Sequence, residues 1–340
     1  MADPTSEPDA SFQARTKPKV VAIGGGSGLA TLLRGLKNYP VSLSGIVTMT
    51  DNGKSSGRLS REMGVLPPGD VRKCLAALSN DEQLLTKLFE YRFEKGRGLS
   101  GHSLGNLLLI ALADITGDFE SAVQASSKIL SIKGEVIPST LEHVSLIAKL
   151  KNGFQALGEV DIAVQGHRFG IDEVSLQPID VKANPTALRF IENADLILIG
   201  PGSFYTSVIP NLLIREINEA ISQSNALKVF ICNVSTERGE TEGYDVDEHV
   251  KQLCRYGKAI KFDAVLANNK IVSKNGSEGT LGSVHNITTD RAEINGLPVV
   301  STDLIDHTAP LFHDDRKLAE AIWAVFTTTK TRAQTLSHSR

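Results

Sequence analysis

The sequence predicts an α/β fold: one doubly wound, mostly parallel sheet that carries a helical insertion near residues 66 to 130. Near the N-terminus a strand, a glycine-rich loop, a helix and a second strand follow one another, which indicates parallel strand pairing. Further along, Leu196–Ile199 is apolar at every position, as expected of a parallel strand buried on both faces. Between these segments apolar residues recur with a helical period, which favours an inserted group of helices.

The first unit begins with a strand over Lys19–Ile23, which runs directly into the loop Gly24–Gly28. The helix after this loop carries a leucine stripe between residues 29 and 36. A second strand over Ser44–Met49 ends at Asp51. The segment Arg58–Leu66, which follows, is expected to be a poor helix.

The insertion is predicted to consist of several helices. Asp70 follows the helix-breaking sequence Pro67-Pro68-Gly69 and is expected to be the N-cap of a helix that ends at Leu78. Further helical stripes cover Leu84–Tyr91, Ser103–Ile115 and Phe119–Leu130.

The second half of the chain is predicted to alternate strands and helices. The β-like stretches after Glu135 include Val160–Val164 and Val174–Gln177. They are followed by the strands Leu196–Ile199, Val229–Cys232 and Asp263–Ala267, a helix bearing Leu213, Ile217 and Ile221, and a closing helix over Leu318–Phe326. The expected organisation is a disordered N-terminal tail at residues 1–18, one α/β domain at 19–326 and a flexible C-terminal tail at 327–340.

Composition argues against several classes of partner. The formal net charge is -3 and the isoelectric point about 6.3, so the chain lacks the basic field that favours nucleic acid or an anionic membrane surface. The longest apolar run, Leu107–Ala113, is too short to cross a bilayer. The cysteines form no CxxC pair and are expected to be reduced thiols: Cys74, Cys232 and Cys254. These features predict a cytoplasmic protein.

Four predicted strands end in small or polar residues at what should be one edge of the sheet. The residues that follow these strands are the glycines after Ile23, Asp51, the loop Gly200–Ser203, and Asn233. Ligands of open parallel sheets bind at the carboxyl ends of the strands, where the strand order reverses. We therefore expect the ligand site at this edge.

The first loop resembles a dinucleotide fingerprint with one departure. Gly24 and Gly26 match the first two glycines of GxGxxG, whereas the third position is Leu29. Such a loop brings free amides at a helix N-terminus close to a phosphate. The alternative is that the glycines only make a tight turn between strand and helix. Asp51 stands where a carboxylate accepts hydrogen bonds from ribose hydroxyls.

Two other motif matches are expected to be accidental. The sequence Gly53-Lys54-Ser55 fails as a P-loop because position 48 is Thr48 rather than glycine. Gly53 to Gly57 also spells GxSxG, but a nucleophile elbow needs a sharp strand-to-helix turn, and here the following residues are expected to be a poor helix. A serine hydrolase that uses Ser55 is therefore disfavoured, and Ser55, Ser56 and Gly57 more plausibly offer hydroxyls and amides to a phosphate or sugar.

The remaining polar candidates have structural alternatives. His102 fits a helix-entry residue that bonds to backbone, and Asp70 and Arg72 fit a helix cap and a surface charge. The acids of Gly239–Asp245 fit solvated partners of a helix dipole. The other histidines lack any zinc-ligand spacing, so no metal site is expected: His143, His167, His285, His307, His313 and His338.

Taken together, the ordered motifs resemble the YvcK/CofD-like family (UPF0052), specifically its YvcK-type gluconeogenesis-factor branch. The matching segments are Ile23–Gly28, Thr50–Arg58, Pro67–Arg72, Leu99–Asn106, Gly200–Ser207 with Pro210-Asn211, and Asn233 with Gly239–Thr241. The resemblance implies a Rossmann-like, three-layer α/β/α fold of the CofD type. Two departures stand in the second segment: Asn52 replaces the acid of many relatives, and Lys54 replaces a usual glycine.

The resemblance also implies a non-catalytic protein that binds a nucleotide or nucleotide-sugar, with UDP-N-acetylglucosamine and UDP-glucose as leading ligands. It implies a regulatory role, through an unidentified protein partner, in cell shape and wall synthesis during gluconeogenic growth. The candidate ligand-binding residues are Gly24, Gly25, Gly26, Ser27, Gly28, Asp51, Asn52, Ser55, Ser56, Gly57, Arg58, Asp70, Arg72, His102, Asn106, Gly200, Pro201, Gly202, Ser203, Tyr205, Thr206, Asn233, Glu240 and Thr241.

The alternative function is that of the enzyme cousin, a 2-phospho-L-lactate transferase that moves a phospholactyl-type group from a guanosine nucleotide to a deazaflavin. A transferase would require Mg²⁺ held by Asp51 and Asp70, with Arg58 and Arg72 opposite the phosphate charge and His102 moving a proton. A nicotinamide oxidoreductase is compatible with the fold, but Leu29 breaks its fingerprint. A homodimer is compatible with the apolar surface expected on the insertion.

Overall fold

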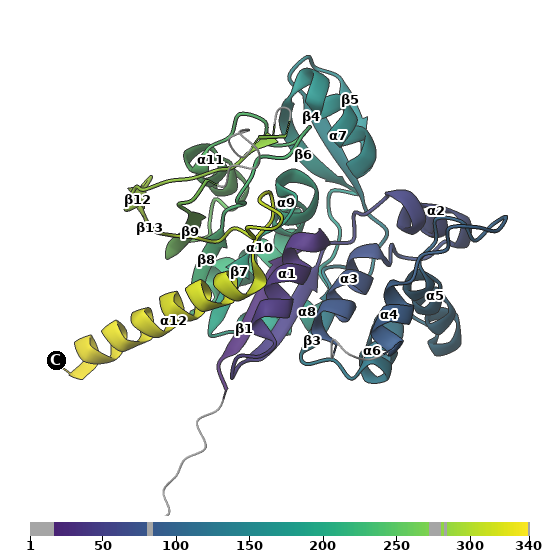
Figure 1. Ribbon diagram of the computed structural model, residues 1–340, viewed down its shortest axis with the longest axis horizontal. Coiled ribbons are helices and arrows are strands. Elements are labelled where there is room, and N and C mark those ends of the chain that lie inside the picture. Colours follow the sequence, from purple (N-terminus) through teal and green to yellow (C-terminus); the bar gives the residue numbers. More distant parts are fainter. Residues whose placement is uncertain (1–16, 80–83, 272–279, 282–283, 339–340) are drawn as a thin grey trace, which may run out of the picture.

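The computed structural model describes residues 17–79, 84–271, 280–281 and 284–338 and is built around an eight-stranded sheet (Figure 1). Each strand of this sheet runs parallel to its neighbours, except β12, which pairs antiparallel with β13. In spatial order the strands are β12 (Glu293–Ile294), β13 (Leu297–Thr302), β9 (Ala264–Asn268), β8 (Leu227–Ile231), β7 (Leu196–Ile199), β1 (Lys19–Gly24), β2 (Ser42–Val47) and β3 (Glu135–Pro138).

The strand order reverses between β1 and β7. From β1 the chain first builds outward through β2 and β3, and it then returns to the other side of β1 to add β7, β8, β9 and β13. Sheets of this order bind their ligands above the carboxyl ends of the two central strands. The fold class predicted from the sequence is confirmed.

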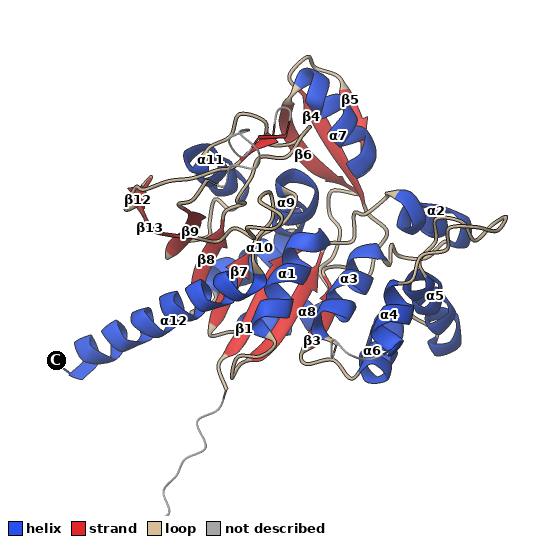
Figure 2. Cartoon of the chain, in the orientation of Figure 1, coloured by secondary structure: helices blue, strands red, loops and turns tan. Residues whose placement is uncertain are grey.

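Two hydrophobic cores, one on each face of the sheet, create three layers (Figure 2). Along β1, Val20 and Ala22 belong to one core, and Val21 and Ile23 belong to the other, because successive side chains of a strand point to opposite faces. The first core includes α1 (Gly26–Leu36), α3 (Gly69–Leu78) and α12 (Asp315–His338), and the second includes α8 (Pro185–Glu192), α9 (Ile209–Leu213), α10 (Arg215–Gln223) and α11 (Val246–Tyr256).

The predicted helical insertion is present between β2 and β3, but it begins at Lys54 rather than near residue 66. Its helices are α2 (Lys54–Met63), α3, α4 (Leu84–Glu90), α5 (Leu104–Thr116) and α6 (Phe119–Leu130). The expectation of a poor helix at Arg58–Leu66 is wrong. Leu59 is buried, and Gly64 ends α2 in the left-handed conformation (φ 65°), so tertiary packing and a C-cap stabilise a segment that is polar overall.

A smaller antiparallel sheet with one helix covers the region after β3. Its strands, in spatial order, are β5 (Gln155–Leu157), β4 (Ser145–Leu150) and β6 (Ile171–Gln177), and the helix is α7 (Gly158–Phe169). The prediction of β-structure over Val160–Val164 is wrong, because these residues lie in α7. The buried positions of α7 are four residues apart, with Ile162 at their centre, while Val160 and Val164 are both more than half exposed.

The C-terminal segment that was expected to be a tail is helical as far as His338. Helix α12 covers it, although the sequence predicted a flexible tail from Thr327. The hydroxyls of Thr327 and Thr329 bond to the carbonyls four residues earlier, and such local bonds satisfy threonine side chains inside a helix. The N-terminal tail predicted at residues 1–18 falls mostly outside the described residues, which begin at Lys17. The remaining strands, β10 (Thr280–Leu281) and β11 (Val284–His285), form a short ribbon.

None of the helices in the described ranges has both the length and the apolar character needed to cross a lipid bilayer.

Packing between α1 and α12 gives a test of the fold. A Cβ atom at Gly35 would lie 2.1 Å from the carbonyl oxygen of Asp315 and 3.0 Å from Cβ of Ala319. We therefore expect Gly35→Ala to force α12 away from α1 and to lower the free energy of unfolding by about 1–3 kcal/mol. Urea unfolding measures this change, with Arg34→Ala on the same helix as a control that should stay within about 0.5 kcal/mol. Unchanged stability of Gly35→Ala would contradict the packing described.

Candidate functional site

The loops after β1 and β7 touch at the point where the strand order reverses. α1 begins two residues after the end of β1, and β7 continues into Gly200–Ser203, with a cis peptide between Gly200 and Pro201. A Cβ atom at Gly28 would lie 2.7 Å from both Cα and N of Gly202. Only glycine at position 28 permits this close approach of the two loops.

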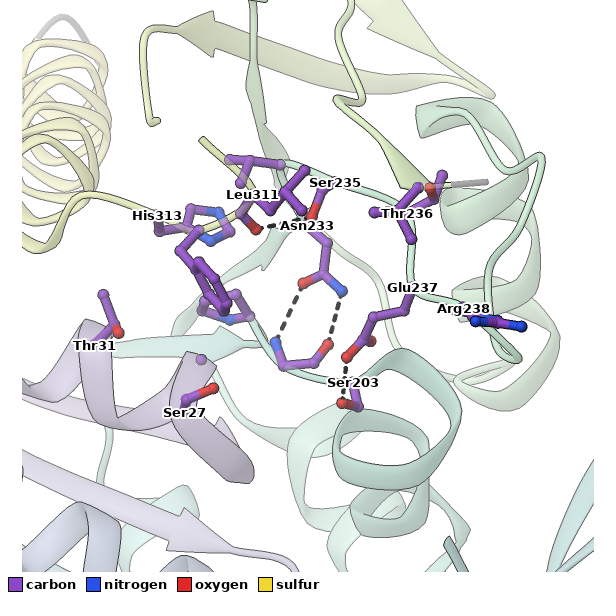
Figure 3. Close-up of a pocket in the computed structure, with 16 residues that line it drawn as sticks. Ser27, Thr31, Ser203, Asn233, Ser235, Thr236, Glu237, Arg238, Leu311 and His313 are labelled. Carbon is purple, nitrogen blue, oxygen red and sulfur yellow. Dashed lines mark hydrogen bonds between the residues drawn. The ribbon is translucent and has the colours of Figure 1, made fainter. Parts of the chain in front are cut away.

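A hollow of about 220 Å³, the crevice, opens over these two loops (Figure 3). Its wall combines the start of α1, the loop after β7, the loop after β8 and the segment that leads to α12. The residues that line it are Ser27, Gly28, Thr31, Pro201, Gly202, Ser203, Asn233, Val234, Ser235, Thr236, Glu237, Arg238, Val284, Leu311, Phe312 and His313.

Asn233 fixes the loop after β7 to the loop after β8. Its Oδ1 accepts from the backbone N–H of Gly202 at 3.2 Å, and its Nδ2 donates to the carbonyl of Gly202 at 2.8 Å (Figure 3). Both polar atoms of this side chain are thus engaged with protein. Asn233 therefore shapes the crevice, and the sequence prediction that it contacts a base or sugar stays a prediction.

Two buried polar atoms in the crevice wall have no hydrogen-bond partner within the described part of the chain. Glu237 accepts the Ser203 hydroxyl on Oε1 at 2.6 Å, while its Oε2 is buried without a partner. Nε2 of His313 is buried without a partner as well. Burial raises the pKa of Glu237 and lowers the pKa of His313 to about 4, so the imidazole is neutral at pH 7.

In the glycine loop after β1, the N–H of Gly26 is already hydrogen-bonded to protein and is not available to a ligand. The N–H of Gly26, at the N-terminus of α1, donates to Oδ2 of Asp70 at 2.6 Å, and Oδ1 of Asp70 accepts from Lys73 at 2.8 Å. The prediction that Asp70 is the N-cap of its own helix is wrong: Pro68 is the N-cap of α3. The carboxylate instead occupies the position on α1 where the fingerprint would place a phosphate.

Asp51 and Asn52 line a second hollow, of about 320 Å³, which shares no lining residue with the crevice. Oδ1 of Asp51 accepts from the N–H of Gly53 at 2.9 Å, and burial together with the nearby Asp70 raises the pKa of Asp51. Asn52 accepts from the N–H of Val160 at 3.3 Å and so anchors the start of α7. The second hollow is lined by Met49, Thr50, Asp51, Asn52, Gly57, Ser60, Arg61, Pro67, His143, Val144, Ser145, Leu157 and Gly158.

The donor set around Asp51 and Asp70 does not fit a magnesium ion. Asp70 uses both oxygens for Gly26 and Lys73, and Lys73 already supplies a positive charge there. Within the described ranges, no three histidine, cysteine or acidic side chains converge on a common point. Mg²⁺ normally takes six oxygen ligands in near-octahedral geometry, so it would have to displace Lys73.

Glu240 caps the helix that follows β7. Its carboxyl accepts from the N–H groups of Tyr205 and Thr206 at 2.8 and 3.3 Å and from the Thr206 hydroxyl at 2.7 Å, at the start of the π-helix η1 (Phe204–Val208). The expectation that the acids of Gly239–Asp245 are solvated is wrong for Glu240, which burial and Glu237 hold at a pKa of about 8. Thr241 accepts from the N–H of Glu237 at 2.9 Å and so positions that residue.

The predicted serines, Arg58, Arg72 and His102 of the insertion line neither hollow, although Ser56 bonds to Asp51 of the second hollow. Ser55 lies 2.9 Å from His102, and Ser56 accepts from the N–H of Gly69 at 3.1 Å. Lys54, at the start of α2, has φ 38°, a left-handed value that favours glycine. The lysine in this chain, where relatives usually have glycine, therefore costs about 1 kcal/mol of backbone strain.

Sequence reasoning missed three residues that line the crevice, Glu237, Thr31 and His313, and one buried acid near the second hollow, Glu159. Glu237 lies in the loop after β8, so its position past a strand end was a usable signal. Glu159 bonds to Thr50 at 3.0 Å, and burial and Asp51 raise its pKa well above the ordinary range, but it lies in the segment that was assigned to β-structure. Thr31 and His313 carry no local signal, because only the fold brings them to the crevice.

Taken together, the strand order and the crevice define a doubly wound α/β protein with a candidate ligand site at its topological switch point. A family model described as "2-phospho-L-lactate transferase CofD" matches residues 20–305. The chain is 43% identical to the "Gluconeogenesis factor" of Halalkalibacterium halodurans and 42% identical to that of Bacillus subtilis, over 90% of this chain and 96% and 97% of theirs. A crystal structure of a UPF0052-family protein from Bacillus halodurans superposes with a TM-score of 0.83 at 43% identity, covering 90% of this chain and 99% of that one.

The chain belongs to the CofD family, in its gluconeogenesis-factor (YvcK, UPF0052) branch. The resemblance drawn from the sequence is confirmed.

The raised pKa of Glu240 predicts how stability depends on pH. The folded protein binds this proton more tightly than the unfolded chain, because the pKa is about 8 instead of 4.5. This contribution is fully present below pH 4.5 and is lost as the pH rises towards 8, at up to about 1.4 kcal/mol per pH unit. Urea unfolding at about pH 5.5 and about pH 8.5 should therefore show a smaller loss of stability in Glu240→Gln than in the wild type.

The matched control is Glu219→Gln, an exposed glutamate of α10. This variant should keep the wild-type pH profile. A Glu240→Gln variant that loses stability between the two pH values as steeply as the wild type would remove the assignment.

Proposed function

We propose that this protein is a gluconeogenesis factor that binds a nucleotide-sugar in the crevice and acts as a regulatory binding protein. UDP-N-acetylglucosamine and UDP-glucose are the ligands that the family resemblance favours. The regulated process is cell shape and wall synthesis during growth on gluconeogenic carbon sources. The names of the two similar proteins, both gluconeogenesis factors, support the link to gluconeogenesis.

The observation that carries the proposal is the pair of unpartnered buried atoms in the crevice, Oε2 of Glu237 and Nε2 of His313. Buried polar atoms are normally hydrogen-bonded, and an unpaired one costs about 1–3 kcal/mol. A base or sugar carries the N–H and O–H groups that would complete the Glu237 carboxyl. The neutral imidazole offers either a donor or an acceptor according to its tautomer.

The size of the crevice limits which part of the ligand it holds. About 220 Å³ is below the roughly 300–1,000 Å³ of common small-molecule sites, so a complete UDP-sugar extends beyond it. We place the nucleoside portion in the crevice, and the diphosphate and sugar outside it, near Arg238 at the rim.

A connection from the crevice to its surroundings runs through Ser203. Its hydroxyl donates to Glu237, and the π-helix η1 begins at the next residue under the Glu240 cap. A ligand that bonds to Glu237 competes with Ser203 and changes the start of η1. If such a change alters the surface seen by a partner, ligand binding shifts a conformational equilibrium, as regulation requires.

Calorimetric titration with UDP-N-acetylglucosamine, UDP-glucose, NAD and GDP tests the ligand class. We expect micromolar binding of a UDP-sugar and at least about tenfold weaker binding in Thr31→Phe, in which the larger side chain fills the crevice. Thr327→Phe, on the exposed part of α12, is the matched control and should bind as the wild type does. Asp51→Ala reports whether the ligand reaches the second hollow, because binding then weakens in this variant too. No binding of any UDP-sugar would refute the proposal.

The second candidate is transferase activity, which the family model favours by its description and its match to residues 20–305. Asp51 and Asp70 lie close enough for Asp70 to raise the pKa of Asp51, which is the carboxylate pair this chemistry would use. Because Lys73 occupies Asp70, we expect no Mg²⁺-dependent GDP binding and no transfer of a phospholactyl group to a deazaflavin acceptor. Formation of that product, lost in Asp51→Ala, would replace the regulatory proposal with an enzymatic one.

A further inference from the structure

Two helices of the insertion start beside one another and are joined by a serine–histidine contact. Ser55 is the second residue of α2, and His102 lies two residues before the first residue of α5. Oγ of Ser55 lies 2.9 Å from Nδ1 of His102, and Nδ2 of Asn106 donates to the same Oγ at 3.1 Å. The Asn106 amide supplies a donor to the hydroxyl, and this arrangement is compatible with a Ser55 proton directed to Nδ1. His102 then carries its own proton on Nε2, where it is a donor.

Buried polar atoms without partners gather around this contact. Nε of Arg72, Oγ of Ser103 and Oδ1 of Asn106 have no hydrogen-bond partner within the described ranges. These residues are 8%, 0% and 2% exposed. A buried polar atom without a partner costs free energy, and a ligand that bonds to Nε of Arg72 would remove that cost.

Charges of both signs surround this group. Arg58 and Arg92 lie near it, and the carboxylates that act on it are Glu62 on His102, and Glu90, Asp70 and Asp51 on Arg72. The guanidinium of Arg92 donates to the carbonyl of Gly101 at 2.5 Å, and that of Arg58 donates to the carbonyl of Ser100 at 3.3 Å. Burial and the Arg58 charge lower the pKa of His102, and burial and the Arg92 charge lower the pKa of Arg72. Glu62 and Glu90 act on this group in the opposite sense but form no ion pair with it in the described part of the chain.

A glycine in the first turn of α5, Gly105, leaves room for the side chain of Arg72. A Cβ atom at Gly105 would lie 2.9 Å from Cδ of Arg72 and 2.4 Å from the carbonyl oxygen of Phe89, so glycine lets the arginine cross the first turn of α5. Neither α2 nor α5 has a side-chain cap, although Ser103 is a residue type that commonly supplies one. Two helix N-termini therefore direct their positive ends to the same region.

We propose that this group, the insertion cluster of Arg72, Arg92, His102, Ser103 and Asn106, is a second ligand site that binds a phosphate monoester. The arginines and the imidazole N–H supply donors and charge for a phosphate, for which the guanidinium fork is well suited. Oδ1 of Asn106 is an acceptor and fits a hydroxyl that the same ligand carries next to its phosphate. Its residues come from α3, from the segment between α4 and α5, and from the first turn of α5, and these helices lie to the right of the sheet in Figure 1. The cluster shares no residue with the crevice wall.

Titration calorimetry with glycerol 3-phosphate, the smallest probe with both groups, tests the proposal. We expect binding that weakens at least about tenfold in Arg72→Met, which removes the buried charge, and in Ser103→Ala. Arg215→Gln, an exposed arginine of α10 paired with Glu219, is the control and should bind as the wild type does. Wild-type affinity weaker than about 1 mM, or equal affinity in Arg72→Met, would overturn the site.

Stability separates a ligand site from a structural role. Since Arg72 and Ser103 hold buried atoms without partners, we expect Arg72→Met and Ser103→Ala to keep or raise the Tm while they lose the ligand. A Tm that falls in both variants would mean that these residues support the fold and would overturn the proposal. The Ser103→Ala variant removes one hydroxyl without a partner, so it keeps the experiment decisive if Arg72→Met fails to fold.

The Thr31→Phe variant distinguishes this site from the proposed nucleotide crevice. We expect it to bind glycerol 3-phosphate normally, and we expect Arg72→Met to bind UDP-N-acetylglucosamine normally. Loss of binding of both ligands in Arg72→Met would show that the insertion cluster binds the nucleotide-sugar itself. That result would overturn the proposal of a separate second site. Absence of UDP-sugar binding in every form of the protein would refute the crevice proposal and leave the phosphate result standing.

Discussion

The contact between Asp70 and the N-terminus of α1 determines how the rest of the candidate site is arranged. It ties α3 of the insertion to the central strand through the N–H of Gly26. In doing so it places a fixed carboxylate where the dipole of α1 would otherwise attract a ligand's phosphate. Lys73 balances that charge. The crevice and the second hollow share no lining residue.

Acidic side chains dominate the carboxyl edge of the sheet, although the sheet order is that of phosphate-binding proteins. Asp51, Glu159, Glu237 and Glu240 are all held by serine, threonine or backbone donors rather than by cations. Burial raises the pKa of all four, and repulsion by nearby carboxylates adds to this for Asp51, Glu159 and Glu240. The basic groups instead collect in the insertion, around Arg72. The two proposed ligand sites thus differ in charge: buried acids line or adjoin the crevice, whereas the insertion cluster contains arginines.

Local patterns predicted the elements whose own residues specify them. The strand Leu196–Ile199 and the helix Phe119–Leu130 have the predicted bounds, because their apolar periodicity is complete within the segment. Predictions from the sequence failed where a residue distant in the sequence determines the structural role of a side chain. Asp70 follows a proline–glycine stop and reads as a cap, yet its partner is Gly26, 44 residues away. Glu237 and His313 line the same crevice only because the fold brings there a segment near α12 that has no motif.

The cap on the π-helix has a consequence for thermodynamic measurements. Because Glu240 titrates near pH 8 and Glu237 lies beside it in the crevice, a ligand that contacts either carboxyl changes how many protons the protein holds. Complex formation is then linked to proton release or uptake, and the buffer absorbs or supplies the difference. The heat observed will include the ionisation enthalpy of the buffer. Titrations in phosphate and in Tris, compared at one pH, would therefore count the protons exchanged and report on the crevice without any structural probe.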